Sequence, residues 1–400
     1  MNTRRRLALV IVALPLAFYG YACSSDDSTD NPAGEDGGTE TGTNPGNDSS
    51  TGTDTSTGTD SSTKPDAADA GDANDGAVAP TCIGNPLTAD GGGSVDGGVN
   101  LDAGVVTQIV TAFNGDFLDG PQWLDVDGGG FLVYSEYNLT TPQILRVAAD
   151  GGNNVAFRTS GFTGAINGPL GNALRNGVLV TAVDAPNGAG TPTIFLSTTD
   201  GGDAGFIGLG DSGSTSPNDL VVGPNNNLYF TDGQYQNAGH MGLSGLYRIV
   251  DGGVTVVQQN IGRANGIAIT SDLATLYVGI GPLNGEVGDP KAVLQYPITA
   301  ATGAVGVVST FLTAADLVDV PDGMAVDVGG NLWVAEAISG GGGGGRVEVF
   351  SPSKKKLGTI PFPAPQRPTG VAFGGPGNKT LFITTETGVF TYISRCAGVR

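Results

Sequence analysis

The sequence predicts an all-β protein, a six-bladed β-propeller preceded by an export signal and a disordered acidic tether. Three observations support this prediction. Gly accounts for 68 of the 400 residues, which favours tight turns over long helices because Gly adopts positive φ without steric cost. A strand–turn–strand pattern recurs at intervals of 47 to 57 residues. The first 100 residues differ in composition from the remainder, so we expect the propeller to occupy residues 101–400.

Residues 1–22 have the pattern of a lipoprotein-type signal peptide. Three arginines precede a short apolar stretch from Leu7 to Phe18, which is too short for a permanent membrane span. The segment GYAC that follows allows ordinary cleavage before Cys23, or lipidation of Cys23 as the first mature residue. Gly20 stands where a lipobox usually has Leu. We expect lipidation, and therefore an exported protein anchored to a bacterial membrane, periplasmic or on the cell surface.

Residues 23–100 are expected to form a low-complexity tether. From Ser24 to Pro80 the chain has thirteen Asp or Glu, one Lys and no aromatic residue. Such a segment cannot bury enough apolar surface to offset the entropy of ordering. It supplies more than half of the net charge of -21, so the acidity describes the tether more than the propeller. A chain of this charge is not expected to bind nucleic acid, or a membrane except through its lipid anchor.

The three cysteines are Cys23, Cys82 and Cys396. If Cys23 is lipidated, the other two form an even pair in an oxidising compartment, and we expect a disulfide between them. The alternative is two unpaired buried thiols. Strand patterns at VVTQIVTAF from Val105 and at GVFTYIS from Gly388 flank the repeats. We expect these two strands to pair in one blade and close the ring.

The repeated unit is a two-stranded hairpin, which is marginally stable alone and buries its faces by stacking. Six copies, each expanded to about four strands, make a six-bladed propeller, expected to be a monomer. The copies are WLDVDGGGFLVYSE from Trp123, NALRNGVLVTA from Asn172, LVVGPNNNLYFTD from Leu220, IAITSDLATLYVG from Ile267, MAVDVGGNLWVAE from Met324 and VAFGGPGNKTLFITT from Val371.

Short oxygen-bearing side chains stand just before each hairpin. They are Asp119 in DGPQW, Asn172 in GPLGN, Asn218 in SPND, Asn265 in RANG, Asp322 in VPDG and Thr369 in RPTG. Equivalent positions of successive blades converge on the channel of a propeller, so these oxygens are expected to meet there. A ring of amide and carboxylate oxygens suits a hard cation such as Ca²⁺. The alternative interpretation is that these residues only form turns.

The segments DGPQW, SPND…LYFTD, RANGIAIT and VPDGMAVD…GNLWVAEA resemble the gluconolactonase/regucalcin family of six-bladed propellers, over about residues 101 to 395. The family includes senescence marker proteins and luciferin-regenerating enzymes. The resemblance implies a channel cation, Ca²⁺ or another divalent cation such as Mg²⁺ or Zn²⁺, and lactone hydrolysis. It implies that Asp119, Asn265 and Asp322 are metal ligands. Asn218 matches an asparagine that contacts substrate or metal.

Two residues depart from the family pattern. Asp119 replaces a longer glutamate, and Ser216 stands where many members have an arginine that holds sugar-lactone hydroxyls, which favours a less hydroxylated lactone or ester. We expect Asp322 to accept a proton while binding the metal. Asp219 is a second catalytic candidate or a turn cap.

We expect Asn218, Asn172 and His240 to contact substrate. The alternative function is a non-catalytic propeller that binds a ligand or a protein.

Overall fold

The computed structural model describes residues 105–111, 117–126, 129–137, 141–162, 168–184, 192–234, 244–282, 291–337 and 344–399. All of them belong to one compact unit that runs from Asp72 to Arg400. The predicted signal, the tether, Cys23, Cys82 and His240 lie outside the described residues. None of the helices in the described part of the chain is long and apolar enough to cross a membrane.

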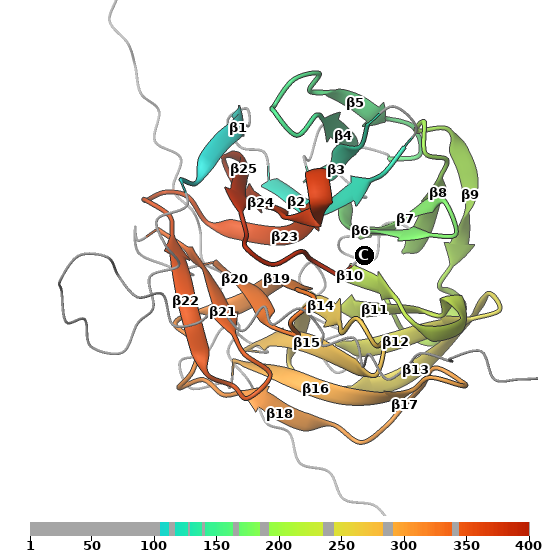
Figure 1. Ribbon diagram of the computed structural model, residues 1–400. Coiled ribbons are helices and arrows are strands. Elements are labelled where there is room, and N and C mark those ends of the chain that lie inside the picture. The colour runs from blue at the N-terminus through green and yellow to red at the C-terminus, as the bar shows by residue number, and fades with distance from the viewer. Residues whose placement is uncertain are drawn as a thin grey trace, which may run out of the picture. The chain divides into compact units, whose positions relative to one another are not determined.

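Six antiparallel sheets surround a central axis, as Figure 1 shows. In each sheet consecutive strands run from the innermost strand outward, except that β1, from the start of the domain, forms the outer edge of the sixth sheet. The innermost strands contact one another in a closed ring, in the order β2, β6, β10, β14, β19, β23 and back to β2. The predicted six-bladed propeller is therefore confirmed.

The first three blades follow one another along the chain. Blade 1 consists of β2 (Phe117–Leu124), β3 (Phe131–Tyr137), β4 (Gln143–Val147) and β5 (Val155–Arg158). Blade 2 consists of β6 (Pro169–Arg175), β7 (Val178–Val183), β8 (Thr193–Ser197) and β9 (Asp203–Gly208). Blade 3 consists of β10 (Pro217–Val222), β11 (Leu228–Asp232), β12 (Gly245–Val250) and β13 (Gly253–Gln259).

The other three blades include the one that joins the two ends of the domain. Blade 4 consists of β14 (Arg263–Ile269), β15 (Thr275–Gly281), β16 (Ala292–Thr299), β17 (Ala304–Val305) and β18 (Ser309–Leu312). Blade 5 consists of β19 (Val320–Val326), β20 (Leu332–Ala337), β21 (Arg346–Phe350) and β22 (Lys356–Pro361). Blade 6 consists of β23 (Pro368–Gly374), β24 (Thr380–Thr385), β25 (Gly388–Ile393) and β1 (Thr107–Thr111). Short 3₁₀ turns are η2 (Gly210–Ser212), η3 (Pro224–Asn226) and η5 (Pro376–Asn378).

Strand β1 completes the last blade. It pairs antiparallel with β25, with Thr107 opposite Thr391 and Thr111 opposite Gly388. The predicted pairing of the first and last strand patterns is therefore confirmed. The ring is closed by hydrogen bonds between the two ends of the domain rather than by packing alone.

Apolar side chains fill the spaces between neighbouring blades. Between blades 6 and 1, the rings of Trp123 and Phe382 stack with centroids 5.3 Å apart. Between blades 5 and 6, Trp333 meets Phe373 edge to face at 5.5 Å. Because each blade is covered on both faces, its inner strands are buried along nearly their whole length, as in LYFTD of β11.

The C-terminal tail returns toward the axis after β25 (Figure 1). Val328 N–H donates to Ala397 O, and Val399 N–H donates to Val326 O, both at 2.9 Å. These bonds tie the tail to blade 5. Cys396 is buried in this tail, and its predicted disulfide with Cys82 stays a prediction because Cys82 lies outside the described residues.

Candidate functional site

Each innermost strand carries a β-bulge near its start. The register with the second strand shifts there in all six blades, for example between Pro321 and Met324. Bulges re-aim side chains and concentrate near functional sites. The residues at this one position, blade by blade, are Asp119, Leu170, Asn218, Asn265, Asp322 and Thr369.

The prediction that these polar residues precede the strands was wrong in detail. They lie inside the innermost strands, because each strand begins one to three residues before them. Asn172 was also misaligned. It follows its bulge, opposite Thr181, and Leu170 occupies the position that Asn218 has in blade 3.

Glycine follows the bulge residue in five of the six blades. A Cβ on Gly266 would lie 1.9 Å from the backbone oxygen of Asp322 in the next blade, so no other residue fits. These glycines let adjacent innermost strands approach closely. In blade 3 the following residue is Asp219 instead.

Asp219 connects two blades. Its Oδ1 accepts the N–H of Leu220 at 2.8 Å, and its Oδ2 accepts the N–H of Ile267 in blade 4 at 3.1 Å. Burial raises its pKa to about 7. Because both carboxylate oxygens bond the backbone, the geometry favours the predicted cap over the predicted general base.

Two more carboxyl groups lie near Asp219. Burial, and then the charge of Asp219, raise the pKa of Asp119 to about 8. Burial, and then the charge of Asp119, raise the pKa of Asp322 well above its usual value. No Lys or Arg in the described part of the chain forms an ion pair with any of the three. The channel thus gathers three acidic groups that form no ion pair within the described part of the chain.

Amide groups accompany these carboxyls. Asn265 donates a hydrogen bond to the carboxyl of Asp322. The side chain of Asn218, only 8% exposed, has no hydrogen-bond partner among the described residues. The described ranges contain no cluster of three His, Cys, Asp or Glu side chains that could hold a metal by themselves. The donor set of two carboxyls and two amides nevertheless has the oxygen chemistry that a hard cation requires.

Asn172, predicted to contact substrate, has protein partners on both sides of its amide. Its Nδ2 donates to Gly120 O at 2.7 Å and to Ser135 Oγ at 2.8 Å, and its Oδ1 accepts from Thr181 Oγ1 at 2.6 Å. These contacts join blades 1 and 2. They favour a structural role for Asn172.

A cavity of about 440 Å³ occupies the channel on one side of this ring of residues. Asp119, Asn172 and Asp219 are among its lining residues, whereas Asn218, Asn265 and Asp322 are not. Val399 of the tail also lines it, with apolar residues from all six innermost strands. The polar ring therefore lies at one end of a largely apolar chamber.

The innermost strands start at the end of the channel that lies opposite the chamber. Because the sheets are antiparallel, the second strands end and the third strands begin at this same end of the channel. Five of the segments that join them, residues 138–140, 185–191, 235–243, 283–290 and 338–343, lie outside the described residues. Predicted His240 falls in one of these segments, so the structure does not place it.

Acidic residues stand at or next to the ends of three second strands, where they bind the segments that lead into the innermost strands. Asp232 of β11 accepts hydrogen bonds from the segment that leads into β10, from Ser214 Oγ at 2.6 Å and from two backbone amides. Glu336 of β20 accepts two amides of the segment that leads into β19. Glu386 pairs with Arg367 just before β23. The sequence does contain a pattern that marks these residues, since several of the repeats end in an acidic residue.

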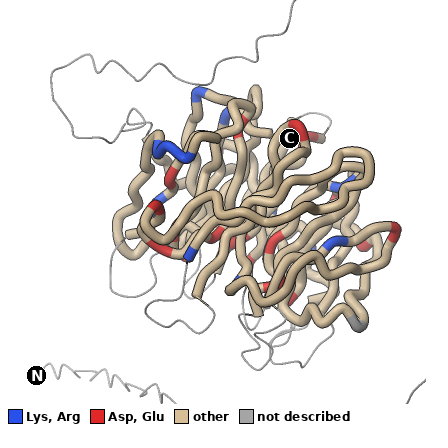
Figure 2. The backbone as a smooth tube through the Cα atoms, turned by 90° about the horizontal axis from the view of Figure 1, so that it is seen from below, with Lys and Arg blue, Asp and Glu red and all other residues tan. Residues whose placement is uncertain are grey.

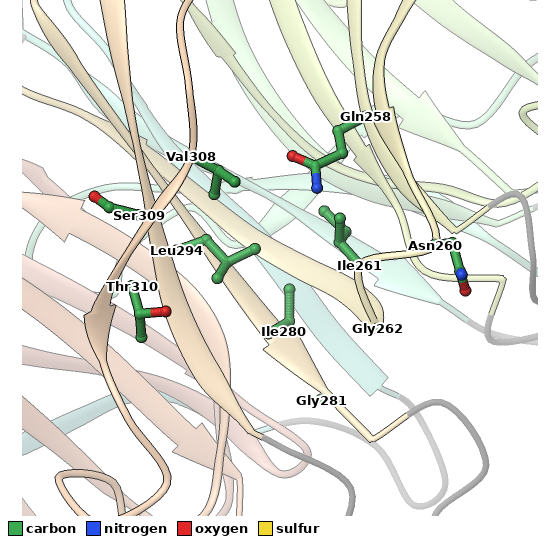
Figure 3. A pocket seen from close by; sticks show the side chains of 10 residues that line it. All are labelled: Gln258, Asn260, Ile261, Gly262, Ile280, Gly281, Leu294, Val308, Ser309 and Thr310. Atoms are coloured by element: carbon green, nitrogen blue, oxygen red, sulfur yellow. The ribbon is translucent and has the colours of Figure 1, made fainter.

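A second cavity of about 380 Å³ lies between blades 3 and 4 (Figure 3). Its ten lining residues include Gln258, Asn260, Ser309 and Thr310 but no titratable group. Figure 2 shows the Lys and Arg residues of the described chain in short, separate segments. Of these two cavities, the one in the channel is therefore the one that titratable groups line.

A family model for the SMP-30/gluconolactonase/LRE-like region matches residues 119–387. The chain belongs to this family. The match begins at Asp119 and extends past Asp322, so the bulge residues of the channel all fall within the family region.

Named proteins are similar to parts of this SMP-30/gluconolactonase-like chain. A pentonolactonase of Haloferax volcanii is 30% identical over 172 residues, 43% of this chain and 53% of that protein. A gluconolactonase of Zymomonas mobilis is 27% identical over 186 residues, 44% of this chain and 49% of that protein. The chain thus spans about half the length of the curated relatives that it matches.

Solved structures support the fold of this family member. A gluconolactonase from Xanthomonas campestris superimposes with a TM-score of 0.55 and 24% identity, covering 72% of this chain and 89% of that one. Regucalcin, a calcium-binding protein of Agrobacterium tumefaciens, gives 0.50 and 17%, covering 71% and 94%. At these identities the likeness shows the propeller alone.

Proposed function

We propose that this protein is a cation-dependent hydrolase of a lactone or related ester, with its reaction centre at the polar ring of the channel. The observation that carries the proposal is the placement of Asp119, Asn218, Asn265 and Asp322 at one equivalent position of four innermost strands. Two similar proteins are named as lactonases. The carboxyl groups of Asp119 and Asp322, which form no ion pair with a described Lys or Arg, would supply oxygen ligands together with the amides of Asn218 and Asn265.

A divalent cation bound there would polarise an ester carbonyl and lower the pKa of a nearby water. Asp119, Asn265 and Asp322 would hold it, and Asn218 would bind it or orient the substrate. Asn265 fixes the Asp322 carboxyl by its hydrogen bond. Asp322 is the group proposed to accept the proton, since Asp219 is committed to two backbone amides. The apolar chamber below limits the water around the reacting group.

The finer features of the proposal concern substrate, cation and location. The backbone N–H of Ser216 donates to Asp232, and its side chain has no guanidinium group that could bind sugar hydroxyls. This favours a weakly hydroxylated lactone or ester as substrate. Ca²⁺ is the proposed cation because the donor set is all oxygen. The signal pattern and Cys23 favour an exported, lipid-anchored protein.

The test follows proton release from a panel of lactones and aryl esters by the purified full chain, with Ca²⁺, Mg²⁺, Zn²⁺ or a chelator. We expect turnover that requires a cation and falls at least about a hundredfold in Asp322→Asn, because one ligand and the proton acceptor are lost together.

Asp272→Asn is the control, because Asp272 is exposed and lies in the turn at the far end of blade 4. Its turnover should match that of the wild type. A folded, cation-loaded protein that turns over nothing in the panel would contradict the hydrolase and favour a binding propeller.

A further inference from the structure

Glu336 holds the chain segment that carries Asp322 into the channel. The Glu336 side chain is fully buried at the end of β20. Its Oε2 accepts the N–H of Val318 at 2.9 Å and the N–H of Asp319 at 2.7 Å. These two residues precede β19, and Asp322 follows three positions after Asp319. One carboxyl oxygen of Glu336 therefore accepts both backbone amides that precede β19.

The other oxygen of Glu336 faces a second acid. Glu336 Oε1 and Glu348 Oε2 are both buried, and neither has a hydrogen-bond partner among the described residues while both groups are ionised. Glu348, on the adjacent strand β21, uses its Oε1 to pair with Lys356. One proton between Oε1 and Oε2 satisfies both orphaned oxygens at once.

The surroundings agree with that proton. Burial, and then the charge of Glu348, raise the pKa of Glu336 to about 8, so it is protonated at neutral pH. Arg346 stands opposite Glu336 in the β20–β21 register, yet no ion pair joins the two. From blade 4, Lys291 donates to Val318 O rather than to the acid. The protonated carboxyl can donate to Glu348 and still accept both amides with its carbonyl oxygen.

Beyond Asp319 the entry segment joins the sheet, where Val320 lies opposite Ala337 and Pro321 lies opposite Glu336. Asp319 Oδ1 accepts the N–H of Val320 at 2.6 Å, and the next residue, Pro321, has no N–H to donate. The Asp322 side chain accepts a hydrogen bond from Asn265 in the neighbouring blade. The position of Asp322 thus depends on how Val318 and Asp319 are held, together with the pairing of Val320 and Pro321 with β20.

We propose that Glu336, linked through a shared proton to Glu348 and Lys356, is a positioning residue that fixes Asp322 for cation binding. This inference rests on the proposed function, since that function makes Asp322 a ligand. Glu336 touches neither cation nor substrate and acts through the backbone of residues 318–320.

The test compares three variants of the full chain by Ca²⁺ calorimetry and by amide hydrogen exchange. In Glu336→Ala we expect Ca²⁺ affinity to fall about tenfold, as when an outer partner of a ligand is lost. We also expect exchange at Val318 and Asp319 to accelerate about tenfold or more as their acceptor disappears. Glu336→Gln should keep both values within about twofold, because its carbonyl accepts the amides and its NH₂ donates to Glu348.

Asp327→Ala is the matched control. Asp327 is a buried acid at the opposite end of β19, where its Oδ1 accepts the amides of Gly329 and Asn331. It should destabilise blade 5 at least as much as Glu336→Ala and leave Ca²⁺ affinity unchanged. If Glu336→Ala does not fold, Glu336→Asp, shorter by one methylene, takes its place.

Wild-type Ca²⁺ affinity in Glu336→Ala would overturn the inference, and so would equal losses in Glu336→Ala and Asp327→Ala. If the wild type binds neither Ca²⁺ nor another divalent cation, the proposed function fails. The positioning role is then decided by exchange at residues 318, 319 and 322, which needs no cation. Unchanged exchange there in Glu336→Ala would overturn it.

Discussion

Blades 3 and 5 perform the same structural task with opposite chemistry. In each, an acid at the end of the second strand holds the segment that delivers a channel residue, Asn218 in blade 3 and Asp322 in blade 5. Asp232 receives five hydrogen bonds, from Ser214, Thr215, Ser216 and twice from Gln234. Glu336 receives two amides and shares its remaining oxygen with another acid.

The difference indicates that the number of hydrogen-bond donors decides whether a buried acid holds the entry segment as a carboxylate or as a protonated carboxyl. Five donors replace the hydration of a carboxylate and act against the rise in pKa that burial causes at Asp232. Two donors do not replace that hydration, so Glu336 keeps a proton and itself becomes a hydrogen-bond donor. An amide side chain imitates the protonated acid but not the carboxylate, and this separates the two blades experimentally.

The largest expected effect is in Asp232→Asn. An NH₂ group would face donors from Ser214, Thr215 or Ser216, leaving several buried groups unpaired, at a cost of about 4 kcal/mol. Chemical denaturation at pH 7 measures the free energy of unfolding. Glu336→Gln is the paired measurement and should change it by less than about 1 kcal/mol. Equal losses in the two variants would break the comparison.

A smaller effect is the pH dependence of stability. The pKa of Glu336 is about 8 in the folded protein and about 4.5 in the unfolded chain, so the folded state binds more protons between these values. Its stabilising contribution is complete below pH 4.5 and is lost as pH rises through 8. We expect the wild type to lose about 2 kcal/mol more than Glu336→Gln between pH 6 and pH 8. Parallel pH profiles for the two proteins would show that Glu336 is already ionised.

The smallest effect is expected at Lys356, the outermost residue of the linked set Glu336, Glu348 and Lys356. Lys356→Ala removes the cation that pairs with Glu348, and we expect a loss of about 1 kcal/mol because the Lys356 side chain is 42% exposed. Thermal unfolding at pH 7 measures it. Lys355→Ala, on the neighbouring exposed residue, is the control and should leave the melting temperature unchanged. A loss as large as that of Asp232→Asn would contradict this ranking, because it would show that the buried charge of Glu348 depends strongly on Lys356.

The repeating architecture could be predicted from the sequence because it depends on local patterns. Apolar alternation around Gly and Asn turns marks six hairpins, and the strand patterns near Val105 and Gly388 had no other partner in that scheme. The last blade has only three strands from the C-terminal part of the domain, so β1 was expected to supply its fourth strand by pairing with β25.

The details of the site depend on register, which the sequence does not display. A bulge moves residues by one or two positions relative to the neighbouring strand, and so Asn172 was aligned with Asn218 although Leu170 is its true equivalent. The partners of Glu336 come from a connecting segment and from the next strand, and no spacing rule joins them. The distinction between a ligand and a cap at Asp219 likewise needed the amide of Ile267, 48 positions away.

The pairing of β1 with β25 also constrains how the domain can fold as it is made. Thr391 Oγ1 donates to Thr107 O across 284 positions of the chain. A nascent chain must keep β1 without its partner until β25 has been synthesised. Such long-range closure is slow and late, so the unfinished ring presents open strand edges throughout translation. Loss of only the last fifteen residues would recreate that unfinished state permanently.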